Sequence, residues 1–125
     1  MRTVMAALIV IAVGGGCRGN NPTEAVAYSI PTGGDAARGR LVIEQRSCGN
    51  CHTIPGVHNA RGLVAPPLYW FARWTFIAGE VPNTPDNLVR WVRSPQSIEP
   101  KTAMPTLGLS DQEARDVAAY LYTLR

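Results

Sequence analysis

Residues 48–52 read Cys48-Gly49-Asn50-Cys51-His52, and this short stretch decides the fold. Two thiols lie three positions apart, and a histidine directly follows the second thiol. Such a pair can form thioether bonds with the two vinyl groups of one porphyrin, and the histidine then lies beneath the iron as its proximal ligand. The motif therefore predicts one covalently attached haem c, with Cys48 and Cys51 as attachment points and His52 as an iron ligand.

Two other interpretations of the paired cysteines fit the sequence less well. A structural zinc site needs four Cys or His ligands, usually as two spaced pairs, and no second pair lies downstream. A thioredoxin-like dithiol needs a strand–helix–strand context, and no strand-like run surrounds Cys48. Haem attachment is the interpretation that the chain favours.

Met104 is the candidate for the second axial ligand of the iron. The other methionines stand at positions 1 and 5, in a segment that we expect to be removed. His58 is too close to His52 along the chain to cross easily to the opposite haem face. A lone methionine is often only a filler of the hydrophobic core, but Met104 lies in a proline-flanked loop that can hold a side chain in place. We therefore expect His52 and Met104 to bind the iron from its two sides.

Residues 1–16 have the pattern of a signal peptide. Arg2 precedes an apolar run from Val4 to Val13, and small residues follow. Such a run directs export but is too short to cross a bilayer, which takes about 20 residues. We expect this segment to be removed.

Cys17 directly follows that segment, and the combination resembles a bacterial lipoprotein signal with Cys17 as the acylated first residue. Gly14 departs from the pattern, because such signals usually carry an aliphatic residue there. The alternative is ordinary cleavage that leaves Cys17 as a free thiol. Acylation predicts an exported protein that its lipid anchors to a bacterial membrane, with the domain in the periplasm or on the outer face of the cytoplasmic membrane.

The charge of the chain gives no support to a nucleic-acid role. Of the 12 basic residues only Arg2 lies in residues 1–16, so 11 basic and 9 acidic residues would remain, and haem propionates would offset much of that small excess. Lys101 is the only lysine. A docking surface would therefore depend on arginine and on exposed apolar groups.

The remaining chain divides into a flexible tether, residues 17–34, and one domain, residues 35–125. The domain is small for an unaided hydrophobic core, and a porphyrin would supply apolar volume. Capping residues predict three helix starts: Asp35, Thr84 followed by Pro85, and Ser110 with Glu113 three positions on. No apolar alternation with period two is present, so we expect an all-α fold. Gly39 predicts a close helix contact, with Tyr120 or Leu121 over it.

Together these features resemble a class I c-type cytochrome, the small monohaem domain with Met and His ligands, over residues 34–125. The matching pieces are Gly34 to Gly39, Cys48 to Thr53, Pro66 with Leu68, Met104-Pro105 and Ala118 to Leu121. The run Val81 to Leu88, with Trp91, Pro95 and Gln96, is similar to the cytochrome c domain fused to subunit II of some bacterial haem–copper oxidases. Glu99 and Lys101 depart from that pattern and alter the docking rim. No copper-site motif precedes the domain, so we expect a stand-alone lipoprotein.

The resemblance implies single-electron transfer between or within respiratory membrane complexes, with a terminal oxidase as a natural partner, and no catalysis by the chain itself. It also implies that the backbone carbonyl of Pro66 holds His52. Within the aromatic segment 69–74 we expect Trp70 or Trp74 to wall the haem. We expect Tyr69, a tryptophan nitrogen or Arg73 to meet a propionate. The alternative for this segment is that the aromatic rings pack in the hydrophobic core and that Arg73 lies on the solvent-exposed surface.

Two residues outside that segment are expected to lie away from the haem: Trp91 in the core and His58 in a surface loop. The competing function is a gas sensor or haem enzyme with an open distal side. A third possibility is a lipoprotein that uses the domain only as an assembly surface.

Overall fold

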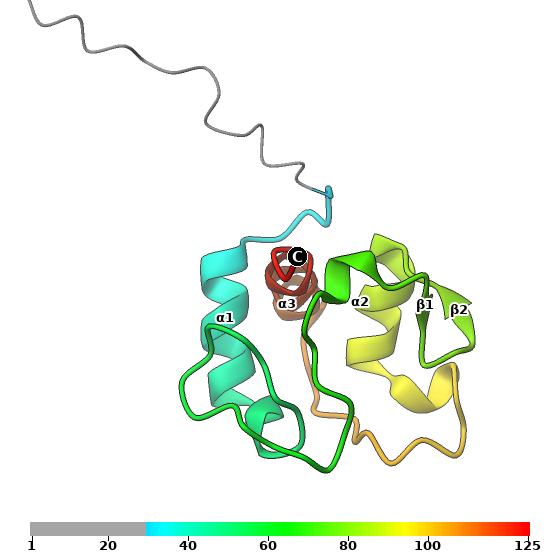
Figure 1. Cartoon of the computed structure of the whole chain (residues 1–125). Coiled ribbons are helices and arrows are strands. Elements are labelled where there is room, and N and C mark those ends of the chain that lie inside the picture. The colour runs from blue at the N-terminus through cyan, green and yellow to red at the C-terminus, as the bar shows by residue number, and fades with distance from the viewer. Residues whose placement is uncertain (1–29) are drawn as a thin grey trace, which may run out of the picture.

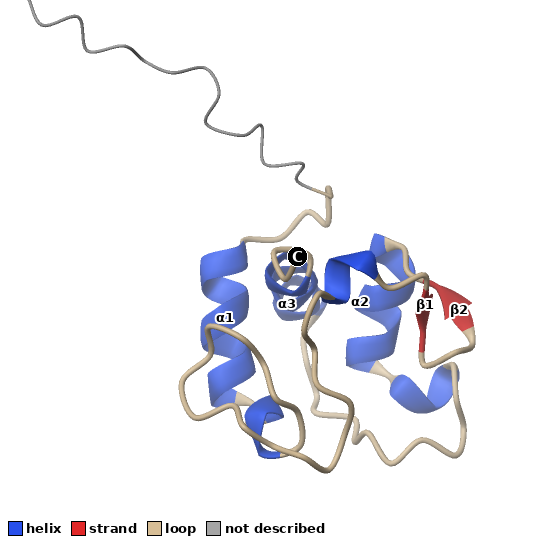
Figure 2. Ribbon diagram, viewed as in Figure 1, coloured by secondary structure: helices blue, strands red, loops and turns tan. Residues whose placement is uncertain are grey.

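The computed structural model describes residues 30–125, and the rest of the chain is drawn in grey (Figure 1). The predicted signal peptide, Cys17 and most of the tether lie outside the described residues. The elements are α1 (Ala36–Gln45), β1 (Phe76–Ile77), β2 (Val81–Pro82), α2 (Pro85–Arg93) and α3 (Asp111–Leu121). Short 3₁₀ turns lie at Cys48–Asn50, Phe71–Arg73 and Pro95–Ser97. Long loops connect these elements (Figure 2).

Each of the three helices begins where its capping residue predicts. The Asp35 side chain accepts a hydrogen bond from the Arg38 amide, and Thr84 caps α2, which carries a proline in its first turn. Ser110 and Glu113 form a complete capping box at α3. Since these bonds satisfy amides that have no partner inside the helix, short local signals were sufficient to fix the three starts.

Gly39 permits the close approach of α1 and α3. Helix α1 crosses α3 so tightly that a Cβ atom at Gly39 would collide with the carbonyl group of Asp116 and approach the amide of Val117. The prediction of a close helix contact is confirmed, but the expected partners were wrong. The backbone of α3 at Asp116 covers Gly39, one turn before Tyr120 and Leu121, because the helices meet nearer the start of α1.

Asp116 of α3 stabilises this crossing of α1 and α3. Its carboxylate accepts hydrogen bonds from Arg38 Nε at 2.9 Å and Nη2 at 2.8 Å, and from the Asp35 amide at 2.7 Å. Gln112 donates a further bond. The Arg38 hydrogen bond first, and the other donors with it, outweigh desolvation and lower the pKa of Asp116 to about 2. A carboxylate that is only 3% exposed thus stays charged and partnered.

Residues before α1 already pack on the domain. Thr32 is 4% exposed, and its carbonyl oxygen accepts a hydrogen bond from Arg115 of α3 at 3.1 Å. A Cβ atom at Gly34 would collide with the backbone of Arg115. The last residues of the segment expected to be a tether therefore lie against α3.

The domain is mostly helical, as predicted, and adds a small antiparallel hairpin. Strand β1 pairs with β2, with Phe76 opposite Pro82 and Ile77 opposite Val81. Each strand has only two residues, so no alternating pattern could reveal it. Asn83 then anchors the hairpin, because its side chain donates to the carbonyl oxygens of Phe71 at 3.1 Å and Trp74 at 3.0 Å.

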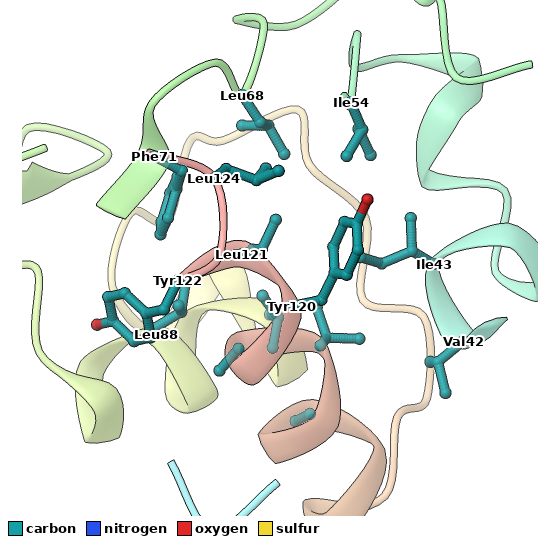
Figure 3. Packing of buried hydrophobic residues seen from close by; sticks show 14 of the residues in the cluster. Val42, Ile43, Ile54, Leu68, Phe71, Leu88, Tyr120, Leu121, Tyr122 and Leu124 are labelled. Atoms are coloured by element: carbon teal, nitrogen blue, oxygen red, sulfur yellow. The ribbon is translucent and has the colours of Figure 1, made fainter. Parts of the chain in front are cut away.

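The buried core lies between the three helices and the inner sides of the loops. Figure 3 shows Leu121 and Tyr120 of α3 between Ile43 of α1 and Phe71 of the segment that precedes the hairpin. The Tyr120 hydroxyl donates to the Pro55 carbonyl oxygen at 2.6 Å. This bond fixes the loop after the Cys48–Asn50 turn to the core.

Candidate haem-binding site

A cavity of about 350 Å³ lies among the motif, the loop 64–68, the hairpin region and the loop between α2 and α3. The loops that follow α1 and α2 extend to the same side of the helices (Figure 1). The lining includes Cys48, Cys51, His52, Pro66, Leu68, Phe71, Trp74, Ile77, Trp91 and Met104. Most of these side chains are apolar, and the volume is in the range of cofactor sites.

The Cys48–Asn50 turn brings both cysteines and the histidine to one wall. The amides of Cys51 and His52 both donate to the Cys48 carbonyl oxygen, at 3.2 and 3.0 Å. The two cysteines form no disulfide bond with each other. The local backbone thus places two cysteine side chains and one imidazole around a single cavity.

His52 is oriented by a backbone acceptor. Its Nδ1 atom lies 2.7 Å from the carbonyl oxygen of Pro66. A carbonyl oxygen can only accept, so Nδ1 carries the proton and Nε2 keeps a free lone pair. This is the partner that was expected for His52, and the arrangement is typical of a histidine that binds a metal through its other nitrogen.

Met104 reaches the same cavity from the loop between α2 and α3. Its side chain is partly buried and packs against the core cluster. Thr102 Oγ1 accepts a hydrogen bond from the Met104 amide at 3.2 Å, and Gln96 Nε2 donates to the Met104 carbonyl oxygen at 2.7 Å. The structure therefore brings a thioether to a site that already holds an imidazole and two thiols.

The aromatic segment 69–74 contributes only part of what was expected. Trp74 lines the cavity, whereas neither Trp70 nor Arg73 does. Trp70 has a left-handed backbone with φ of 52° and is 59% exposed, and Arg73 lies on the surface. The left-handed residue and the following 3₁₀ turn direct Phe71 inward, so the assignment of Trp70 and Arg73 to the pocket is not supported by this geometry.

Several lining residues were not predicted from the sequence, among them Phe71, Ile77 and Arg46. Trp91 packs against the core cluster, as expected, and also lines the cavity, because the apolar side of α2 faces both the core and the cavity. Arg46, which caps the end of α1, lines the cavity too. Its guanidinium donates to the carbonyl oxygen of Leu107 at 3.3 Å and pairs with Glu113 at 2.8 Å. No sequence signal marked that role, since it depends on the approach of three separate segments. His58 is exposed and does not line the cavity, as expected.

The residues present fit a flat, largely apolar cofactor. A smaller hollow of about 60 Å³ shares Cys48, His52 and Met104 with the main cavity and extends it toward the core at Leu121. Within residues 30–125, no group of three or more His, Cys, Asp or Glu side chains could hold a bare metal ion. The donor set of two thiols, one imidazole and one thioether instead suits an iron porphyrin that is bound covalently.

Comparisons with known proteins identify the family of this domain. The family described as Cytochrome c matches residues 36–125. The chain is 35% identical over 96 residues to "Cytochrome c oxidase subunit 2" of Alkalihalophilus pseudofirmus, covering 76% of this chain and 27% of that protein. It is 30% identical over 94 residues to the protein of that name from Bacillus subtilis, covering 72% and 26%. The chain thus spans about a quarter of the length of these curated relatives. The chain belongs to the cytochrome c family, whose domain carries covalently bound haem c.

Proposed function

We propose that this chain carries single electrons through one haem c, with thioether bonds to Cys48 and Cys51 and with His52 and Met104 as axial ligands. The observation that carries the proposal is that His52 and Met104 line the same cavity. Met104 is the only methionine among the described residues. The bound haem supplies the change between ferrous and ferric iron.

The protein's own residues then keep the site closed. Two strong ligands leave the iron no position for a substrate or a gas, and a thioether ligand raises the reduction potential. Leu68, Phe71 and Ile77 are buried side chains of the cavity wall, and they exclude water from it. A closed, apolar site with little room to rearrange favours electron transfer over ligand chemistry.

We further propose that the partner is a membrane respiratory complex such as a terminal oxidase. Support comes from the relatives, which are named subunit 2 of cytochrome c oxidase. It is consistent with this role that exposed apolar side chains, those of Leu63 and Val64, lie in the loop beside the motif. The amide of Ala65 in that loop donates to the Cys51 carbonyl oxygen at 3.0 Å.

Attachment to a membrane through lipid on Cys17 completes the proposal. None of the helices within residues 30–125 is long and apolar enough to cross a bilayer. The motif at residues 1–17 supports export and acylation, with the domain in the periplasm or on the outer face of the cytoplasmic membrane. Cell fractionation tests this: the natural chain should sediment with membranes, and Cys17→Ser should move to the soluble fraction. Equal membrane retention of both after a salt wash, which removes protein held only by a partner complex, would contradict the lipid anchor.

The electron-transfer role is tested on the full, haem-loaded protein. A potentiometric titration should follow a one-electron curve, and the ferrous protein should bind carbon monoxide poorly. Met104→Ala should bind it readily. If the natural protein binds carbon monoxide as readily as Met104→Ala, the distal side is open, and a gas sensor or haem enzyme becomes the better account.

A further inference from the structure

The loop that carries Met104 has almost no backbone support of its own. No hydrogen bond between two backbone groups involves residues 103–109 of the described chain. Side chains instead hold the polar groups of this loop. A ligand loop built in this way depends on those few side chains to keep its methionine in place.

Gln96 makes a direct hydrogen bond to the backbone of Met104. Its Nε2 atom donates to the Met104 carbonyl oxygen at 2.7 Å, while the Met104 amide donates to Thr102 Oγ1 at 3.2 Å. Both polar backbone groups of the predicted ligand are therefore engaged by side chains. The Gln96 bond is the shorter of the two, and it comes from outside the loop.

Gln96 is itself oriented by Thr106. The Thr106 hydroxyl donates to Gln96 Oε1 at 2.8 Å. A carbonyl oxygen on one side and a hydroxyl on the other require the amide to place its nitrogen toward Met104. One glutamine side chain thus spans the loop on both sides of Pro105.

The backbone that presents Gln96 is anchored by a buried proline and by hydrogen bonds of the turn. Gln96 lies in the Pro95–Ser97 turn directly after α2, and Pro95 is among the fully buried side chains. The amide of Ile98 donates to the Pro95 carbonyl oxygen at 3.0 Å, and the Ser97 hydroxyl donates to the Ser94 carbonyl oxygen at 2.7 Å. A turn anchored by one buried proline and by these hydrogen bonds can transmit the position of α2 to the loop.

We propose that Gln96 is a positioning residue that keeps Met104 on the iron and so keeps the distal side closed. This inference rests on the proposed function, since it assumes that Met104 binds the haem iron. Gln96 does not touch the iron. It limits how often the loop moves away and opens the sixth coordination position.

The experiment compares carbon monoxide binding to the ferrous, haem-loaded, full-length protein. Gln96→Leu removes both hydrogen bonds, whereas Gln96→Glu keeps an acceptor for Thr106 but places a carboxylate against the Met104 carbonyl oxygen. Thr106→Val removes only the orienting bond. Gln45→Leu is the matched control, because Gln45 is exposed at the end of α1 and makes no side-chain hydrogen bond within the described part of the chain.

Carbon monoxide binds only when Met104 is off the iron, so its apparent affinity rises with that population. Loss of the Gln96 bond should raise this affinity roughly two- to tenfold in Gln96→Leu and Gln96→Glu. The carbon monoxide affinity of Thr106→Val should rise less, and that of Gln45→Leu should match the affinity of the natural protein. On heating of the oxidised protein, the far-red sulfur-to-iron absorption band should be lost before the helices unfold, at temperatures that fall in the same order, whereas general destabilisation would lower both transitions together.

The two proposals can fail separately. If the natural protein is closed to carbon monoxide while Gln96→Leu and Gln96→Glu match it in affinity and in the temperature at which the far-red band is lost, Gln96 has no positioning role. If the natural protein already binds carbon monoxide as readily as Met104→Ala, the proposed function itself fails.

Discussion

Nδ1 of His52 donates to the carbonyl oxygen of Pro66 across 2.7 Å, and this contact decides which ring nitrogen faces an iron. The acceptor belongs to the backbone, so no side-chain substitution can remove it. Two consecutive prolines instead restrict it, because Pro66 has a fixed φ and Pro67 restricts the conformation of the residue before it. The backbone conformation of this loop thus sets the orientation of the predicted proximal ligand.

Loosening this pair of prolines should raise the reduction potential. In the double variant Pro66→Gly, Pro67→Gly the hydrogen bond to His52 weakens, so the imidazole becomes a weaker base and stabilises ferric iron less. Spectroelectrochemical titration measures the midpoint. Pro31→Gly, at an exposed proline before α1, is the control and should leave the midpoint unchanged. A fall in the double variant would contradict this account.

Gly39→Ala should destabilise the protein despite the better helix propensity of alanine. In an unpacked helix the change would gain about 1 kcal/mol. Here the new methyl group collides with the backbone at Asp116, and such overpacking costs about 1–3 kcal/mol. Urea denaturation of the haem-loaded protein gives the free energy of unfolding, and its sign decides the question. The exposed position Ala37 supplies a control, where Ala37→Gly should lose about 1 kcal/mol through propensity alone.

Acidic pH should lower the stability of the domain through protonation of Asp116 and Glu113. Hydrogen bonds from Arg38 and from Arg46, respectively, lower the pKa of each carboxyl to about 2, from ordinary values of 3.8 and 4.5. A lowered folded-state pKa gives stability that is present above the ordinary pKa and is lost as the pH falls toward 2. Thermal unfolding followed from pH 6 to pH 2 should therefore show a steady decline.

Asp116→Asn should flatten part of that acid dependence, because the amide cannot titrate. Asp86→Asn removes the same charge from an exposed position in the first turn of α2 and should retain the slope of the natural protein. Identical slopes for the natural protein and Asp116→Asn would show that Asp116 does not carry the effect.

Alkaline pH should lower the stability of the domain through ionisation of Tyr122. Burial raises the pKa of Tyr122 to about 12, and its hydroxyl donates to Asn83 Oδ1 at 2.9 Å. A raised folded-state pKa gives stability that is complete below the ordinary value of 10.0 and is lost between there and about pH 12. Tyr122→Phe should lose about 1 kcal/mol at neutral pH and show a shallower decline above pH 10. The exposed Tyr69 offers Tyr69→Phe as a control with an unchanged profile.

The parts of the fold that could be predicted from the sequence depend on neighbouring residues. Asp35, Thr84 and Ser110 each cap a helix through a residue three positions away, so their spacing alone is informative. The haem motif is equally local. Met104 could be singled out because few methionines compete with it.

The parts that could not be predicted depend on contacts between distant segments or on unusual backbone geometry. Either Trp70 or Trp74 was expected at the haem, and the sequence could not decide between them: Trp74 lines the cavity, whereas Trp70 has a left-handed backbone and is exposed. Arg46 lines the cavity only because α1, the Met104 loop and α3 converge there. Gln96 was noted only as part of a resemblance, since its contact with Met104 requires the turn after α2 to face the loop.

The central claim is that His52 and Met104 together occupy both axial positions of the haem iron. The most direct test is the optical spectrum of the oxidised, haem-loaded protein in the far red, where iron bound by a thioether sulfur absorbs weakly. We predict that the band is present in the natural protein and absent in Met104→Ala, while the covalent haem signature remains in both. Absence of the band in the natural protein would contradict the account and place the distal side in an open or differently ligated state.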